Sequence, residues 1–414
     1  MTADAFQPDL QSHVYQSDPV PTLHRLREED PVHRSRHGYW FLTRYDHVKF
    51  ALRDPRFSSD WARRQAERAG SGRGAPAAAS PYEESETDRE NRQLILSSFN
   101  MKDGRDHSRI RTLVNHAFGK AALESRRGRV QEVVDELLDG AAARGSFDLV
   151  TELGFPLPMV VASEMIGIPG DERERFRRSF EEAGVLGVPG HSAELHATAL
   201  EALDWQLGLA RGLVEARRER PEDDLITALV EAEEEGDKLS VDEIISAVVT
   251  IFTAAGTTTE RFVSSGLLLL LQHPEEQARL RSDPALLPTA MEEILRFHHP
   301  DQSTSTARWV TEDVELGEKV LRKGDRVRLG LGAANRDPSQ FPDPDRLDLA
   351  RTPNRHLAFG RGAHFCVGAG LARLEAEVAI LATLDRFPQI ELLTKEPRRD
   401  PRRMDRYEEI RVRV

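Results

Sequence analysis

The feature that most restricts this chain is a glycine-rich stretch, HLAFGRGAHFCVGAGLA at residues 356–372. It contains Cys366, the only cysteine among 414 residues. A lone cysteine cannot form an internal disulfide, which argues against a disulfide-stapled secreted fold and for a reducing compartment. Gly360, Gly362 and Gly368 let the backbone turn tightly and approach a flat partner closely. We therefore predict a loop here, followed by a helix over about residues 367–386.

The position of Cys366 near a helix start indicates a chemical role for its sulfur. Amides at a helix N-terminus stabilise a thiolate over a thiol through the dipole and hydrogen bonds. Zinc wants about four ligands with CxxC-like spacing, and the stretch offers neither a second cysteine nor a nearby aspartate. A thiolate under aromatic cover is instead a good axial ligand for the iron of one large planar cofactor. The alternative is a buried free thiol that packs as a small hydrophobic side chain.

The segment FGRGAHFCVG resembles the haem-binding signature FGxGxHxCxG of the cytochrome P-450 superfamily at every fixed position. The resemblance implies a mainly α fold with small β-sheets, as one triangular-prism-like domain over residues 1–414. It implies haem b (iron protoporphyrin IX) as the cofactor, with Gly368 among the residues that contact it. It also implies that Cys366 is the proximal iron ligand, that Phe359 packs beneath the porphyrin, and that His364 reaches a propionate.

Haem carries two propionates, so cations are expected around it. His107 and Arg111 are spaced i and i+4 in HSRIR and therefore share one helix face. By resemblance this HxxxR pattern contacts the propionates, and Arg308 in STARWV matches another propionate ligand. Arginine is suited to bidentate carboxylate binding. The alternative for His107 and Arg111 is a solvated basic face.

A second set of residues carries a structural prediction. Glu293 and Arg296 in EEILRF lie three apart on one helix face. The segment PDRL at residues 344–347 resembles the family's PxRF segment, with Leu347 in place of the usual aromatic residue. By resemblance, Glu293, Arg296 and Arg346 form a buried network that fixes the chain under the haem. Alone, the pair would be a surface contact worth about 0–1 kcal/mol.

The segment TAAGTTTE at residues 253–260 is predicted to form the oxygen side of the site. It resembles the family pattern (A/G)Gx(D/E)T through Ala255, Gly256 and Thr259, where Ala255 would contact the haem. Thr258 replaces the usual acid, so proton delivery differs. Three sources could replace the acid, of which Thr259 with ordered water is the favoured relay. A polar group on the substrate is the second, and Glu260 would serve only if a helix bulge turned it inward, because one residue is about 100° around a helix. The alternative is an ordinary buried helix with small residues for packing.

Periodicity indicates the elements around these motifs. Helices are predicted over residues 107–118, 121–144, 171–182, 193–220, 240–272 and 367–386, and short strands in STARWV, DVELG and DRVRLGLG. Residues 335–351 are too rich in proline and aspartate for a regular helix or central strand. Residues 69–90 are predicted to be a mobile loop, and residues 187–191 a second moving element.

Charge and hydropathy restrict the function class. A net charge of −13 disfavours nucleic-acid binding. The first twenty residues lack a basic start followed by an apolar run, and the strongly apolar run at 245–256 is shorter than the roughly 20 residues that span a bilayer. We expect a cytoplasmic monomer without membrane contact.

By resemblance the function is that of a soluble bacterial monooxygenase that inserts one atom of O2, as co-substrate, into an organic molecule. Ferredoxin and ferredoxin reductase would supply electrons from NAD(P)H, with docking at Arg105, Arg109, Arg355, Arg361 and Arg373. The pocket would be lined by residues 69–90 and 187–191 together with Phe252, Ala255, Gln302, Ser303 and Thr304. A mid-sized natural product with some polarity is the expected substrate. Oxidative coupling, desaturation or peroxide-driven oxidation, and a haem-based sensor without enzymatic activity, are the alternatives.

Overall fold

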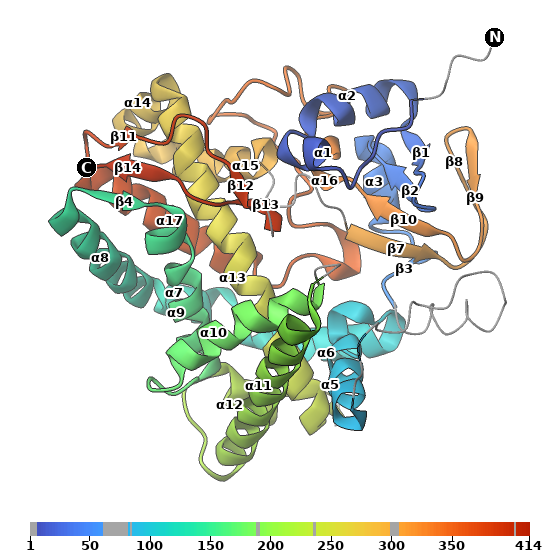
Figure 1. Ribbon diagram of the computed structural model, residues 1–414, viewed down its shortest axis with the longest axis vertical. Helices are drawn as coiled ribbons and strands as arrows, with labels where there is room; N and C mark the ends of the chain where they lie inside the picture. The colour runs from blue at the N-terminus through green and yellow to red at the C-terminus, as the bar shows by residue number, and fades with distance from the viewer. Residues whose placement is uncertain are drawn as a thin grey trace. The chain divides into compact units, whose positions relative to one another are not determined.

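The computed structural model describes residues 6–60, 82, 85–187, 191–234, 237–298, 306–400 and 403–414. Contacts between residues divide the chain into two compact units. The first unit comprises Met1–Ser58, Arg127–Leu157 and Thr258–Val414, and the second comprises Ser59–Arg126 and Pro158–Thr257. The division falls within one long helix, α13, between Thr257 and Thr258. Helices predominate and the sheets are small, as the sequence predicts (Figure 1).

The first unit contains a five-stranded sheet in the order β1-β2-β10-β7-β3. Its strands are β1 (Val32–Arg34), β2 (Trp40–Leu42), β3 (Phe57–Ser58), β7 (Thr306–Val310) and β10 (Arg326–Leu329). Strand β10 pairs parallel with β2 and antiparallel with β7, with Val327 opposite both Trp40 and Arg308. The sheet therefore places Arg308 on a central strand pair.

The remaining strands of the first unit form three smaller sheets. These are β11-β14-β4, β12-β13 and β8-β9. Their bounds are β4 (Ser146–Asp148), β8 (Val314–Leu316), β9 (Lys319–Leu321), β11 (Glu391–Leu392), β12 (Arg399–Asp400), β13 (Arg403–Tyr407) and β14 (Arg411–Arg413). Gly317 turns the β8–β9 hairpin with φ +58° and Gly324 turns the chain before β10 with φ +88°. The three strand segments predicted from sequence are confirmed as β7, β8 and β10.

Helices surround these sheets. In the first unit they are α1 (His13–Ser17), α2 (Val20–Glu29), α3 (Tyr45–Ala51), α8 (Arg127–Arg144), the π-helical turn η2 (Val150–Gly154), α14 (Pro274–Ser282), η4 (Pro284–Leu286), α15 (Leu287–Phe297), α16 (Leu331–Ala334), η5 (Gly362–His364) and α17 (Ala369–Arg386). Helix α17 packs against both α8 and α15. The chain from Asn335 to Arg351 is irregular, as predicted, and it stays irregular as far as Arg361.

A buried apolar cluster lies behind the cysteine loop. It joins Leu42, Val48, Val327 and Phe341 to Leu357, none of which exposes more than 1% of its surface. Leu357 precedes the cysteine by nine residues, and its amide also donates to Asn335 Oδ1 at 2.7 Å. Burial of its side chain at roughly 1.5–3 kcal/mol fixes one end of the loop to the core of the unit.

Where the structure describes the second unit, it is helical apart from one short hairpin. Its elements are α5 (Glu86–Leu96), η1 (Phe99–Met101), α6 (Gly104–Ala117), α7 (Lys120–Ser125), α10 (Arg173–Ala183), η3 (Gly184–Gly187), α11 (Ala193–Glu219), α12 (Leu225–Glu231), β5 (Glu233–Glu234) and β6 (Asp237–Lys238). Helix α9 (Pro156–Ile166) begins in the first unit and continues in the second. Helix α11 packs against α5, α10 and α12.

Two predicted elements differ from the structure. The helix expected over 121–144 breaks at Arg126, whose amide donates to the carbonyl of Leu123 in a tight turn instead of continuing the ladder. The loop expected over 69–90 is wrong for 86–90, which form the start of α5. Ser85 and Asp88 build a capping box there, with each side chain accepting from the other's backbone amide. Of the rest of that loop only Tyr82 and Ser85 are described.

Helix α13 (Val241–Gln272) is long and apolar enough to cross a membrane, judged by length and composition. More than half of its apolar window is nonetheless buried, at 56%. It is a regular α-helix along its whole length. These properties are those of a core helix, as the sequence predicts for this apolar run.

Candidate active site

The cysteine loop is shaped by backbone hydrogen bonds within the first unit. The amide of Cys366 donates to the carbonyl of Phe359 at 2.9 Å, so the chain folds back on itself between these two residues. The amide of Gly360 donates to Leu357 at 2.8 Å. Gly360 and Gly362 adopt φ of +68° and +77°, a region that strongly favours glycine. Cys366 itself is partly buried, and α17 begins three residues after it.

The glycines of the loop are not equivalent. A Cβ on Gly362 would lie 2.7 Å from the carbonyl oxygen of Leu52, so both its dihedral angle and its packing require glycine. Gly368 instead has φ −81° and caps α17, and a Cβ there would meet no protein atom within 4 Å. The turn predicted at Gly368 is confirmed, because the amide of Ala369 donates to the carbonyl of Cys366 at 3.5 Å, but its φ does not require glycine. The open space beside Gly368 is compatible with close approach of a flat partner.

These residues fit a haem. A soft thiolate is a ligand of iron, and a macrocycle supplies four further donors to the metal by itself. Among the residues that the structure describes, no group of three or more histidine, cysteine, aspartate or glutamate side chains is placed to hold a metal ion. The one cysteine of this loop can supply the thiolate donor that an iron porphyrin needs.

The carboxylate of Glu293 is the centre of a buried polar cluster in the first unit. It pairs bidentately with Arg296 of the same helix at 2.7 and 2.8 Å, and both side chains are fully buried. Arg351 donates to both carboxylate oxygens at 3.1 and 3.2 Å, and Asn354 donates at 3.0 Å. The cluster therefore fixes the irregular chain that leads to the cysteine loop.

The third member predicted for this cluster, Arg346, is wrong. Its side chain is 66% exposed and lies 4.0 Å from Asp348. Its backbone carbonyl takes part instead, accepting from Arg296 at 3.4 Å and from Arg351 at 3.1 Å. Arg351 and Asn354 were missed because an irregular segment has no periodicity that says which side chains turn inward.

The predicted oxygen-side residues lie on α13. Thr258, Thr259 and Glu260 belong to the first unit; Thr259 is 4% exposed and Glu260 is fully buried. The hydroxyl of Ser264 donates to Glu260 Oε1 at 3.0 Å and to the Glu260 carbonyl at 2.7 Å. Because the helix is regular here, the bulge that would rotate Glu260 is absent from the structure.

The other predicted cofactor residues are distributed over both units. Arg308 on β7 is 8% exposed and donates to the carbonyl of Ala307 at 2.8 Å, and His364 ends the 3₁₀ turn η5. In the second unit, His107 on α6 is 2% exposed and Arg111 follows one turn later on the same helix. His107 and Arg111 therefore lie one turn apart on the same helix, as their spacing predicts.

The predicted substrate residues have mixed outcomes. Phe252 is 1% exposed and packs edge-on against Phe176 and Phe180, with ring centroids 4.3 and 5.6 Å away, so its ring has little surface for a ligand. Ala255, three residues after Phe252 on α13, is partly buried. Gln302, Ser303 and Thr304 lie outside the described residues.

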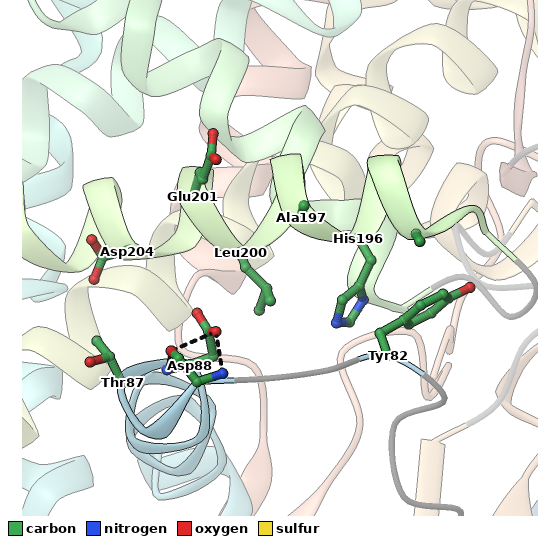
Figure 2. Close-up of a pocket in the computed structure, with 10 residues that line it drawn as sticks. Tyr82, Thr87, Asp88, His196, Ala197, Leu200, Glu201 and Asp204 are labelled. Atoms are coloured by element: carbon green, nitrogen blue, oxygen red, sulfur yellow. Dashed lines mark hydrogen bonds between the residues drawn. The ribbon is translucent and has the colours of Figure 1, made fainter.

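A hollow of about 700 Å³ lies between α5 and α11 in the second unit. Figure 2 shows His196 and Leu200 pointing from α11 toward Tyr82 and Asp88. The ring of Tyr82 stacks on His196 at 4.4 Å and its hydroxyl donates to the carbonyl of His191. The hollow is lined by Tyr82, Ser85, Thr87, Asp88, Ala193, His196, Ala197, Leu200, Glu201 and Asp204.

Comparison with known proteins agrees with this fold. Residues 201–405 match the family described as cytochrome P450. The chain is 40% identical over 376 residues to cytochrome P450 107B1 of Saccharopolyspora erythraea, covering 89% of this chain and 87% of that protein. It is 36% identical over 389 residues to 6-deoxyerythronolide B hydroxylase of the same organism, covering 93% and 92%.

A solved structure shows the same architecture. PksS, the cytochrome P450 of the bacillaene polyketide synthase of Bacillus subtilis 168, aligns with a TM-score of 0.86 at 32% identity and covers 99% of this chain and 100% of that one. This mainly helical fold is that of the cytochrome P450 structures, which are oxygenases. The chain belongs to the cytochrome P450 family. It is a monooxygenase that uses haem iron and O2.

Proposed function

We propose that Cys366 is the iron ligand of this enzyme. The observation that carries the proposal is the Phe359–Cys366 turn, closed by a 2.9 Å hydrogen bond and built on two left-handed glycines. Phe359 and Gly368 would contact the haem on the cysteine side, and Ala255 on the oxygen side. His107, Arg111, Arg308 and His364 would balance the two propionates. The two compact units would together form the single domain that the sequence predicts.

Bound haem supplies the activation of O2 from which one oxygen atom passes to the substrate. The chain's own groups then have to hold protons and exclude bulk water. The Thr259 hydroxyl can donate and accept, so it can order a water molecule. Thr258 adds a second hydroxyl at the position where the family pattern has an acid, and Glu260 would act only by a different helix geometry. We assign the relay to Thr259 with ordered water.

The proposed substrate is a mid-sized secondary metabolite that is hydroxylated or epoxidised. Two relatives support this class, because one is named for hydroxylation of 6-deoxyerythronolide B and the other for its place in a bacillaene polyketide synthase. The hollow beside Tyr82 offers one aromatic face, the apolar Leu200 and three carboxylates, from Asp88, Glu201 and Asp204. Such a lining suits a molecule with both apolar and polar parts.

Electrons would come from NAD(P)H through ferredoxin reductase and ferredoxin. Of the five arginines predicted for docking, Arg109 is paired with Glu243 and Arg373 with Glu292, so neither offers an uncompensated charge. Arg105, Arg355 and Arg361 are exposed and would attract an acidic carrier despite a net charge of −13. The proposed enzyme is a cytoplasmic monomer that needs neither membrane nor nucleic acid.

A second candidate function is oxidative coupling, desaturation or peroxide-driven oxidation on the same haem. Thr258 favours it, because a hydroxyl at the acid position does not titrate near neutral pH. Both functions share Cys366 and differ in the mass of the product. Oxygen insertion adds one oxygen atom, whereas desaturation and coupling remove hydrogen.

The test begins with the reduced carbon monoxide complex of freshly purified holoprotein. A Soret band characteristic of thiolate ligation is expected, and it should disappear in Cys366→His together with oxygenase activity. A band of histidine ligation in the folded wild type would overturn the ligand assignment. Turnover with NADPH, ferredoxin reductase and ferredoxin, read by mass spectrometry of the product, then separates oxygen insertion from hydrogen removal.

A further inference from the structure

A second carboxylate, adjacent to the Glu293 cluster, binds the cysteine loop directly. Glu292 lies on α15 and accepts two hydrogen bonds from Arg373 of α17, at 2.6 Å from Nε and 2.9 Å from a terminal nitrogen. Two parallel bonds of this kind between arginine and carboxylate fix both position and orientation. The guanidinium also donates to the Ala369 carbonyl at 3.3 Å, at the first turn of α17. Arg373 is thus held at both ends of its planar group.

His356 supplies the other partner of Glu292. Its Nδ1 accepts from the amide of Ala358 at 3.1 Å, so that nitrogen carries no proton. Its Nε2 therefore carries the proton and donates to Glu292 Oε2 at 3.0 Å. The imidazole side chain is 4% exposed. One carboxylate consequently ties α17, through Arg373, to the residue that opens the cysteine loop.

The cation of this cluster, Arg373 of α17, also contacts a side chain of the loop. The carbon of the Arg373 guanidinium sits 4.4 Å from the centre of the Phe359 ring, within the range of a cation–π contact. The backbone carbonyl of the same Phe359 accepts from the Cys366 amide. Displacement of the Phe359 ring would therefore move the hydrogen bond that shapes the backbone at the sulfur. Burial alone would raise the pKa of Glu292, but bonds from Arg373 and then His356 outweigh it and lower the pKa to about 2.

Adjacent glutamates on α15 thus have different partners. Glu293 binds Arg296 and Arg351 and fixes the irregular chain before the loop, whereas Glu292 binds His356 and Arg373 and fixes the loop and the following helix. Successive residues are about 100° apart around a helix, which lets them reach different segments. We propose that Arg373, held by Glu292, which also binds His356, is a positioning residue that keeps the Phe359–Cys366 turn in the conformation that ligates iron through a thiolate.

This inference rests on ligation by Cys366. It predicts what happens when the contacts of Glu292 with Arg373 and His356, which we call the clamp, are lost. Arg373→Gln and Glu292→Gln should each accelerate loss of the thiolate-ligated carbon monoxide complex by about tenfold or more, the change expected from one lost charge-assisted hydrogen bond. The double variant should be slower to lose the complex than the product of the two single effects predicts, because both variants remove the Glu292–Arg373 contact. Arg373→Lys should be intermediate, since lysine keeps the charge but not the planar bidentate group.

The experiment follows the thiolate Soret band of the carbon monoxide complex in mild denaturant. Arg361→Gln is the control, because it removes an exposed arginine from the same loop. Hydrogen exchange of the holoprotein provides a readout other than activity. Exchange at Ala358 and Cys366 should rise in Arg373→Gln while amides of α17 beyond its first turns keep their wild-type rates. A merely structural role would raise exchange throughout the first unit.

Two results overturn the inference separately. If the wild type gives no thiolate band, ligation by Cys366 fails and the clamp has no such ligand to position. If the wild type gives that band but Arg373→Gln and Arg361→Gln lose it at the same rate, Cys366 remains the ligand and Arg373 does not position it. Should Arg373→Gln fail to fold, Arg373→Lys and Glu292→Gln carry the same comparison.

Discussion

A fully buried carboxylate such as Glu293 is stable only when nearly every lone pair is satisfied. Besides the two arginines and Asn354, its Oε1 accepts from the Asp348 amide at 3.0 Å. Removal of one cation from a buried pair leaves an uncompensated charge, which costs about 3–5 kcal/mol. Arg351 bonds to Glu293 and Arg346 does not, so the fold should depend on Arg351 rather than on Arg346.

We expect Arg351→Ala to lower the unfolding free energy by about 1.5–3 kcal/mol, the value of a lost hydrogen bond to a charged group, because Glu293 keeps its pair with Arg296. Arg346→Ala, which removes a 66% exposed side chain, should change it by less than about 1 kcal/mol. Denaturant midpoints of the two holoproteins, with haem retention recorded, measure the difference. Equal shifts would show that the exposed arginine carries as much of the network as the buried one.

The sequence led to Arg346 rather than Arg351 for a physical reason. The segment PDRL has an arginine at the position of the family motif, but Asp343 turns the chain with φ +47° just before it. In such a turn the backbone carbonyl of Arg346, not its side chain, faces the buried pair. A helix pattern predicts which side chain turns inward, and an irregular segment does not. The Glu293–Arg296 pair was predictable because both residues share one helix face.

Proton delivery is a second question at the scale of single residues. Under the relay through Thr259 and water, Thr259→Ala should increase peroxide release per electron consumed. Glu260→Gln should do little, because Glu260 accepts from Ser264 on its own helix. Peroxide and NADPH consumption are measured together with a turning-over substrate. Uncoupling by Glu260→Gln alone would transfer the relay to the glutamate. If neither variant has an effect, the substrate or peroxide supplies what the protein lacks, which favours the coupling or peroxide-driven alternative.

At the scale of elements, long periodic helices were predicted to within a few residues. The runs expected over 193–220 and 240–272 are observed as Ala193–Glu219 and Val241–Gln272. The π-helical turn Val150–Gly154 was not predicted. Its hydrogen bonds join residues five apart instead of the four of an α-helix, and nothing in its sequence indicates this difference. The amide of Gly154 donates to Leu149 at 2.8 Å in this turn, which lies against α13 at Glu260 and Ser264.

We expect Gly154→Ala to destabilise the protein by about 1–3 kcal/mol through overpacking. The new Cβ would lie 2.9 Å from the Leu149 carbonyl oxygen, 3.1 Å from that of Glu260 and 3.3 Å from Ser264 Cβ. Gly212→Ala is the matched control, because this glycine lies within α11 and a Cβ there meets nothing within 4 Å. It should stabilise by about 0.5–1 kcal/mol. If both variants shift the denaturant midpoint upward, the π-helical turn can accommodate a Cβ at residue 154 and the prediction of overpacking is wrong.

At the scale of the whole molecule, the dependence of stability on pH adds contributions of opposite sign. Glu292, with a pKa lowered to about 2, adds stability at pH above 4.5 that is lost as pH falls toward 2. Glu375 on α17 acts in the other direction. Burial raises its pKa to about 8, and within the described part of the chain its Oε2 has no hydrogen-bond partner. The native state therefore holds a proton on Glu375 that the unfolded chain releases above about 4.5.

Because the native state binds more protons than the unfolded state between pH 4.5 and 8, Glu375 lowers stability progressively across that window. The slope is at most about 1.4 kcal/mol per pH unit for one proton. Glu375→Gln keeps a neutral side chain at every pH, so it should exceed the wild type in stability at pH 7 and match its pH response below 4.5. Denaturant midpoints of both proteins from pH 4 to 8 measure this difference in stability, in which the contribution of Glu292 cancels because both proteins contain it.

Glu396→Gln, which changes an exposed carboxyl, is the control, and its stability should follow that of the wild type across the same pH range. A constant difference between Glu375→Gln and the wild type across this range would mean that Glu375 is ionised in the folded protein.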